Sequence, residues 1–113
     1  GLALDCGPGQ TIPAATSLAK ALEPYNLAWA EDQITGDYVP YTDPEAYRLV
    51  SSSTSTPILT GEHIYLRQGF RELISWHAVD IVAPDLCDVG GLAENKWIAE
   101  FADLYGDATA LER

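Results

Sequence analysis

The chain has 113 residues, 47% of them apolar, which is enough for one ordinary domain with a buried core. Only 6 Lys and Arg residues accompany 17 Asp and Glu residues, so the formal charge is −11. This balance excludes the basic face that a nucleic acid or an anionic membrane needs, but not an anionic small molecule, because a bound divalent cation can reverse the local field.

Four short apolar runs recur along the chain, each followed by a polar loop and a helical pattern. The runs are almost continuously apolar, as expected for parallel strands that are covered on both faces. They occupy residues 2–4, 27–30, 57–61 and 79–84. No run approaches the ~20 residues that span a bilayer.

The helical patterns carry recognisable start and stop signals. Thr11 is expected to cap the first helix, with Pro13 in its opening turn and Pro24 at its end. Either Thr42 or Asp43 is expected to cap the second helix. Gly106 is a natural stop for the fourth. The expected apolar faces of the four helices are, in order, Ala15, Leu18, Ala19 and Leu22; Ala46, Leu49 and Val50; Phe70, Leu73 and Ile74; and Ala93, Ile98, Phe101, Ala102 and Tyr105.

Four consecutive strand–helix units with right-handed crossovers predict a parallel α/β sheet. Two architectures are compatible with this pattern: an open doubly wound sheet, and a four-unit arc of a TIM-like (β/α) barrel, whose usual length is ~250 residues. The chain length favours the open sheet, whereas the positions of the acidic residues favour the barrel.

An acidic residue closes each predicted strand: Asp5, Glu31, Glu62 and Asp85. In parallel α/β folds the carboxyl ends of the strands form the ligand-binding mouth, so these side chains are expected to gather there. Crowded carboxylates repel one another unless a cation neutralises them, and a set of oxygen ligands suits Mg²⁺. Any one of these acids, taken alone, is more often a helix cap or a solvated loop residue than a metal ligand.

The same segments resemble the enolase superfamily, and within it the mandelate racemase/muconate lactonizing enzyme family near its acid-sugar dehydratases. The resemblance covers residues 2 to about 106. It is carried by Leu2-Ala3-Leu4-Asp5, by Leu27-Ala28-Trp29-Ala30-Glu31-Asp32, by Thr56-Pro57-Ile58-Leu59-Thr60-Gly61-Glu62, and by Val79-Asp80-Ile81-Val82-Ala83-Pro84-Asp85 with Gly90-Gly91.

This resemblance implies the central part of a C-terminal barrel domain and a Mg²⁺-assisted abstraction of the proton α to a carboxylate, leading to dehydration or racemisation of a sugar acid. By the family pattern, Asp5, Glu31 and Glu62 are the metal ligands. Asp85 matches an aspartate that orients a catalytic histidine on the following strand.

The sequence departs from the family pattern at both ends. The following strand is expected after Gly106, where residues 107–113 contain no histidine. The family's lysine base belongs to a strand before Leu2, and the capping domain is also missing. We therefore expect residues 1–113 to form a partial barrel of four units that either belongs to a longer polypeptide or self-associates. An inactive barrel piece and a Mg²⁺-dependent phospho-acceptor module with an open sheet are the alternatives.

Several other residues invite a functional interpretation. His63 follows the third proposed ligand, so it is either a substrate contact and substitute acid–base group or a solvent-facing loop residue. His77 is expected to lie at a helix C-terminus, where the helix dipole favours a positive charge. The aromatic loop at residues 36–42 either touches substrate or packs locally. Cys6 and Cys87 are expected to pack, as are Trp29 and Trp97. Two cysteines are too few for a disulfide framework, and no secretory signal is recognisable, so a cytoplasmic location is expected.

Overall fold

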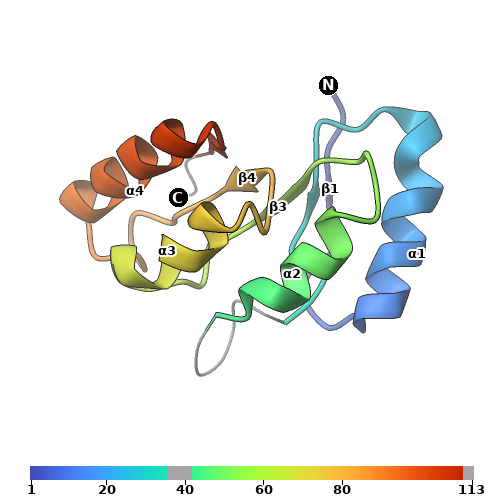
Figure 1. The fold of residues 1–113 in the computed structure, drawn as a ribbon, viewed down its shortest axis with the longest axis horizontal. Coiled ribbons are helices and arrows are strands. Elements are labelled where there is room, and N and C mark those ends of the chain that lie inside the picture. Colours follow the sequence, from blue (N-terminus) through green and yellow to red (C-terminus); the bar gives the residue numbers. More distant parts are fainter. Residues whose placement is uncertain (36–41, 111–113) are drawn as a thin grey trace.

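In the computed structural model, which describes residues 1–35 and 42–110, short parallel strands alternate with helices (Figure 1). The strands are β1 (Leu4–Asp5), β2 (Ala30–Glu31), β3 (Ile58–Thr60), β4 (Ile81–Val82) and β5 (Ala108–Thr109). The helices are α1 (Ile12–Leu22), the 3₁₀ turn η1 (Glu23–Tyr25), α2 (Pro44–Ser51), α3 (Leu66–Ser75) and α4 (Leu92–Tyr105). None of these helices is long and apolar enough to cross a membrane.

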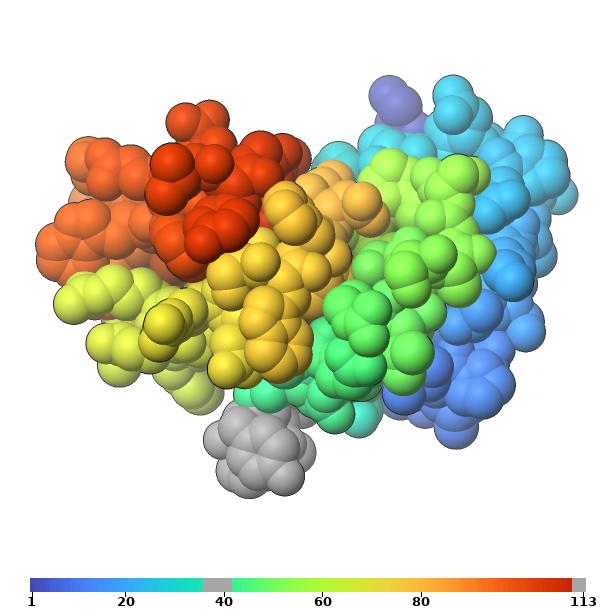
Figure 2. All heavy atoms as spheres, viewed as in Figure 1, coloured from blue at the N-terminus to red at the C-terminus, as the bar shows by residue number. Residues whose placement is uncertain are grey.

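The strand order in the sheet is β1-β2-β3-β4-β5, the same as the order along the chain, and every neighbouring pair is parallel. With right-handed crossovers, a constant direction of winding places all helices on one face. Helix α1 indeed packs against α2, α2 against α3, and α3 against α4, and the space-filling view shows these helices as one outer layer (Figure 2). An open doubly wound sheet reverses its strand order and carries helices on both faces. The structure is therefore an arc of a barrel, and the open-sheet alternative is wrong.

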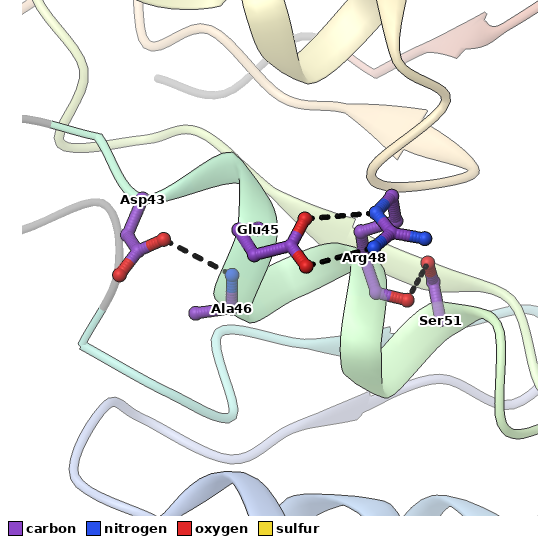
Figure 3. A network of polar contacts seen from close by, with 5 residues as sticks. All are labelled: Asp43, Glu45, Ala46, Arg48 and Ser51. Carbon is purple, nitrogen blue, oxygen red and sulfur yellow. Dashed lines mark hydrogen bonds and ion pairs between the residues drawn. The ribbon is translucent and has the colours of Figure 1, made fainter.

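Most expected helix signals are confirmed. The hydroxyl oxygen of Thr11 accepts the backbone N–H of Ala14, and α1 ends at Leu22, with Pro24 in the 3₁₀ turn that follows. Asp43 is the residue that caps α2, because its Oδ1 accepts the N–H of Ala46 at 3.0 Å (Figure 3).

Later in α2, Arg48 pairs with Glu45, and Ser51 donates to the Arg48 carbonyl oxygen (Figure 3). Gly106 ends α4 with a left-handed φ of 82°, which a residue with a side chain adopts at a cost.

The strand register divides the sheet residues between two faces. Ala30, Ile58 and Val82 belong to the core cluster that includes the buried helix residues, so they face the helices. Successive side chains alternate across a strand. The opposite, inner face therefore carries one in-register row across the first four strands: Asp5, Glu31, Leu59 and Ile81.

Four helix or loop side chains lie differently from expectation. Leu49, expected to face inward, is 46% exposed, because Tyr47 and Val50 occupy the inward arc of α2. Ala93 is exposed in α4 while Asn95 is buried, with its Nδ2 donating to the Pro84 carbonyl oxygen at 3.1 Å.

The other two residues are aromatic. Tyr105 is 39% exposed and lies edge-on to Phe101. Trp97 is not a packed residue either: it is 46% exposed, and the Arg67 guanidinium lies 4.3 Å from its ring centroid.

A fifth strand changes the expected edge of the sheet. The run at residues 79–84 is the last of the four strands expected from the sequence, but it is not the edge of the sheet: β4 pairs with β5, and the N–H of Ala110 donates to the Val82 carbonyl oxygen at 2.9 Å. Within the described residues, the two outer strands are β1 and β5.

Candidate functional site

Asp5 and Glu31 lie side by side at the carboxyl ends of β1 and β2. Their Cα atoms are register partners, and both side chains belong to the inner-face row. The N–H of Cys6 donates to the Glu31 carbonyl oxygen at 3.0 Å, which extends the pairing just beyond the strand ends. Asp5 is exposed and Glu31 is partly buried, so the structure brings two of the expected metal ligands together at an open surface.

Each of these two carboxylates has a local hydrogen-bond donor. Asp5 Oδ1 accepts the backbone N–H of Gly7 at 3.0 Å. Glu31 Oε2 accepts the indole N–H of Trp29 at 2.9 Å, from a residue two positions earlier on the same face of the strand. Trp29 thus orients a carboxylate in addition to packing, a role that its apolar surroundings in the sequence did not suggest.

The pKa of the Cys6 thiol reflects the negative charge of this surface. Its pKa is raised chiefly by burial, and further by the negative charges of Asp5, Asp32 and Glu31. Three acidic groups therefore act on one point near the ends of β1 and β2. A cation is the natural complement of such a field.

Glu62 and His63 form a second feature, just after β3. His63 Nε2 lies 3.0 Å from Glu62 Oε1, and both side chains are about one-third exposed, at 30% and 39%. A neutral imidazole with its proton on Nε2, or a protonated one, donates to the carboxylate in this geometry. His63 thus contacts the third expected metal ligand while its side chain stays partly exposed in the loop after β3.

Asp85 forms a tight turn after β4. Its Oδ1 accepts the N–H groups of Cys87 at 2.6 Å and of Asp88 at 3.1 Å. This is the local capping role that an isolated acid at a strand end commonly has. The adjacent strand β5 consists of Ala108 and Thr109, so its described residues offer no imidazole for Asp85 to orient.

The donor chemistry at this edge suits a hard divalent cation, because Asp5, Glu31 and Glu62 supply only carboxylate oxygens. Within residues 1–35 and 42–110, however, no three His, Cys, Asp or Glu side chains come together as a ready-made metal site. The structure pairs Asp5 with Glu31 and Glu62 with His63. A single site formed by the three carboxylates remains a prediction.

One buried polar cluster near this edge was not expected from the sequence. Asp32, Thr60 and Tyr47 are 2%, 0% and 1% exposed, and their oxygen atoms are linked by hydrogen bonds. The only sequence signal was a polar residue directly after Glu31 and another inside an apolar run. Neither has the periodicity that marks a core position.

The other candidates from the sequence are His77, the two cysteines and the aromatic loop. His77, at the end of α3, contacts Asp107 near the amino ends of β4 and β5, so it does not approach the carboxyl-end surface. Cys6 is partly buried, and Cys87 is exposed rather than packed. The expected aromatic loop falls mainly on residues 36–41, outside the described residues.

Comparisons with known proteins give a consistent result. Residues 1–111 match a family described as enolase C-terminal domain-like. The chain is 43% identical over 104 residues to the D-xylonate dehydratase of Haloferax volcanii, covering 92% of this chain and 24% of the relative. It thus spans about a quarter of the length of that curated relative.

Solved structures agree with this assignment. The mandelate racemase/muconate lactonizing enzyme-like protein of Rubrobacter xylanophilus superposes with a TM-score of 0.87 at 41% identity, over 96% of this chain and 26% of that protein. The L-talarate dehydratase of a Polaromonas species, crystallised with Mg and L-glucarate, superposes with a TM-score of 0.89 at 28% identity, over 99% of this chain and 30% of that enzyme.

Proposed function

Because the chain belongs to the enolase C-terminal domain-like family, we propose that residues 1–113 form the metal-binding part of a barrel that catalyses Mg²⁺-dependent proton abstraction α to a carboxylate. The substrate class is a sugar acid, and the reaction is dehydration or racemisation. Two of the proteins named above support this class: one is a D-xylonate dehydratase, and the other is an L-talarate dehydratase that was crystallised with L-glucarate. The chain itself would contribute four strand–helix units and the start of a fifth strand to a larger barrel domain.

In this proposal, Asp5, Glu31 and Glu62 hold Mg²⁺. The bound metal would stabilise the charge that develops on the substrate carboxylate as the proton leaves. The acidic surface around Cys6, where Asp5, Asp32 and Glu31 act together, would repel an anionic substrate, and a bound cation would offset this repulsion. The chain's own residues then have to keep the three proposed ligands close together and turned toward the inner face.

His63 and Asp85 receive secondary roles. We assign His63 to substrate contact or to proton transfer, because its ring is held beside Glu62 at the mouth. Asp85 would orient a histidine at the carboxyl end of the following strand, while one of its oxygens holds its own turn. We also propose a cytoplasmic location, where the free thiols of Cys6 and Cys87 would remain reduced.

The observation that carries the proposal is the in-register pair Asp5–Glu31 on the inner face. The same surface raises the pKa of the Cys6 thiol, after the larger effect of burial, through the charges of both residues and of Asp32. A strand-end pair of carboxylates at the carboxyl edge of a barrel lies where barrel enzymes place their functional groups.

Titration calorimetry with Mg²⁺ tests the proposal on the 113-residue chain. We expect the wild type to bind Mg²⁺ and Glu31→Gln to bind it at least about 10-fold more weakly, because one ligand is lost. Glu72→Gln is the matched control, since it makes the same change in charge at an exposed position on α3. Equal loss in both variants would reveal only a general charge effect and would overturn the site.

A further inference from the structure

The backbones that carry Glu31 and Glu62 are joined by one buried hydrogen-bond network. Thr60 Oγ1, whose single proton can go to either partner, lies 2.7 Å from Asp32 Oδ1 and 2.8 Å from the Tyr47 hydroxyl oxygen. The Tyr47 hydroxyl also donates to the Ile34 carbonyl oxygen at 3.0 Å. The network therefore connects the segment after β2, the end of β3 and helix α2.

This network includes residues that are close in sequence to two of the proposed metal ligands. Asp32 directly follows Glu31, and Thr60 lies two residues before Glu62. A single hydrogen bond between Asp32 and Thr60 thus links the two chain segments that supply two of the three carboxylates. It does so on the helix side, whereas Glu31 belongs to the inner face.

Burying a carboxyl group and two hydroxyl groups is costly unless their hydrogen bonds are made, and an apolar side chain would fill this space without that cost. Buried polar networks that are retained tend to specify one arrangement of their surroundings. The arrangement specified here is the separation of the β2 and β3 ends, where the carboxylates lie.

The backbone at Asp32 supports the same interpretation. Its φ is 45°, a left-handed conformation that residues other than glycine adopt infrequently, although Asp tolerates it better than most. The Asp32 N–H donates to the Leu59 carbonyl oxygen at 3.1 Å, so main chain and side chain both attach this residue to β3. The direction in which the chain leaves Glu31 is consequently held at two points.

We propose that Asp32, Thr60 and Tyr47 are positioning residues that fix Glu31 relative to Glu62 for cation binding. The inference rests on the proposed metal site and extends it to residues that touch neither metal nor substrate. Groups that orient ligands from outside the coordination sphere commonly alter metal affinity by about 10-fold or more when removed.

A pair of substitutions at Thr60 separates positioning from packing. Thr60→Val keeps the shape of the side chain and removes the hydroxyl, whereas Thr60→Ser keeps the hydroxyl and removes the methyl group. We expect the Mg²⁺ dissociation constant, measured by calorimetry, to rise about 10-fold in Thr60→Val and to stay within about twofold of the wild type in Thr60→Ser. A packing role alone would make Thr60→Ser the worse variant.

Tyr47→Phe provides an independent test from the other end of the network, and Tyr25→Phe, at a position that is 72% exposed, is its control. Tyr47→Phe is expected to weaken Mg²⁺ binding, and Tyr25→Phe to leave it unchanged. If Thr60→Val does not fold, Tyr47→Phe alone decides. Unchanged affinity in a folded Tyr47→Phe or Thr60→Val variant would overturn the positioning role while the metal site stands.

Amide hydrogen exchange without metal makes failure of the two proposals distinguishable. We expect Tyr47→Phe to accelerate exchange at the Asp32 and Cys6 amides, which flank the Glu31 peptide, more than at the distant Ala110 amide. If wild-type protein binds no Mg²⁺, the proposed metal site is overturned. The positioning role then stands on selective acceleration at Asp32 and Cys6 and falls if exchange is uniform.

Discussion

Acidic side chains occur at both ends of the sheet, but Asp5, Glu62 and Asp85, which close strands at the carboxyl ends, make different kinds of contact from the acids at the amino ends. At the amino ends of the strands they reach across the fold: Asp80 Oδ2 accepts the N–H of Ile58, at the start of the neighbouring strand, at 2.8 Å. Glu23 Oε1 accepts from Thr54 and Ser55, more than 30 positions later, at 2.8 and 3.0 Å. These acids hold successive strand–helix units together.

At the carboxyl ends, Asp32 and Glu94 also reach other units, through Thr60 and Arg67, but three of the acids that close the strands hold only their own loops. Within the part of the chain that the structure describes, the hydrogen bonds and ion pairs of Asp5, Glu62 and Asp85 go to residues at most three positions away. Removing such a side chain should leave the packing of the units intact. The difference matches the general division of barrels into an amino-end face that supports stability and a carboxyl-end face that supports function.

The largest expected effect is self-association of the chain, because it would cover the inner face of the sheet and the two outer strands. Burying about 400 Å² of apolar surface is worth ~10 kcal/mol. We expect sedimentation velocity at low micromolar concentration to show association that strengthens with salt, since screening reduces repulsion between chains of charge −11.

A matched pair of variants tests whether the β1 edge is responsible. Leu2→Lys should weaken association, because Leu2 is 71% exposed beside β1 and a charge there opposes edge pairing. Leu104→Lys, on α4 at 77% exposure, should not. A cooperative monomer at every concentration would contradict the expected association.

The next largest expected effect concerns catalysis. We expect the 113-residue chain alone to show no appreciable turnover of pentonates or hexonates, because loss of a general base costs ~10²–10⁴-fold in rate. Loss of substrate measured by NMR checks this. Efficient turnover would contradict the expectation, and its abolition by His63→Gln would identify His63 as the base.

The stability contrast between the two ends can be measured directly. Asp80→Ala should lower the free energy of unfolding by about 1–3 kcal/mol, because the N–H of the buried Ile58 loses its acceptor. Asp5→Ala, which only frees the N–H of Gly7 to water, should change it by less than about 0.5 kcal/mol. Urea unfolding compares them. Equal losses of unfolding free energy in Asp80→Ala and Asp5→Ala would contradict the distinction between these two acids.

The smallest effect concerns Asp107, at the amino end of β5. Burial raises its pKa above the ordinary value of 3.8, although the hydrogen bond from His77 acts in the opposite direction. The folded state therefore binds the proton more tightly than the unfolded state, and the contribution of Asp107 to stability declines as the pH rises from about 3.8 through the folded pKa.

Asp107→Asn removes this titration. The unfolding free energy of the wild type minus that of the variant should therefore fall with rising pH in this window. Asp103→Asn, at an exposed position nearby, is the control. A difference that is flat or rises with pH would contradict the assignment.

The sequence predicted the parts of the fold that depend on local signals. Thr11, Asp43 and Gly106 mark helix ends through hydrogen bonds or backbone conformations that involve only neighbouring residues. The acids that close the strands were also recognisable, because each follows an apolar run directly.

What could not be predicted depends on residues far apart in the chain. Thr60 looked like any strand residue, and its bond to Asp32 exists only because β2 and β3 are adjacent. Tyr47 replaced Leu49 on the inward face of α2 because the Tyr47 hydroxyl finds partners in the core. Likewise, the pairing of Glu62 with His63 depends on side-chain orientation rather than on sequence spacing.

The agreement between strand order and chain order has a consequence for synthesis. Paired residues on neighbouring strands are only 22 to 28 positions apart, from Leu59–Ile81 to Ala30–Ile58. The entropy lost in closing each such loop is modest and nearly equal for every unit. Among the strands of residues 1–35 and 42–110, none has to wait for a partner from a distant part of the chain. Each unit can therefore dock on its predecessor as it leaves the ribosome, so that the arc grows in one direction during translation.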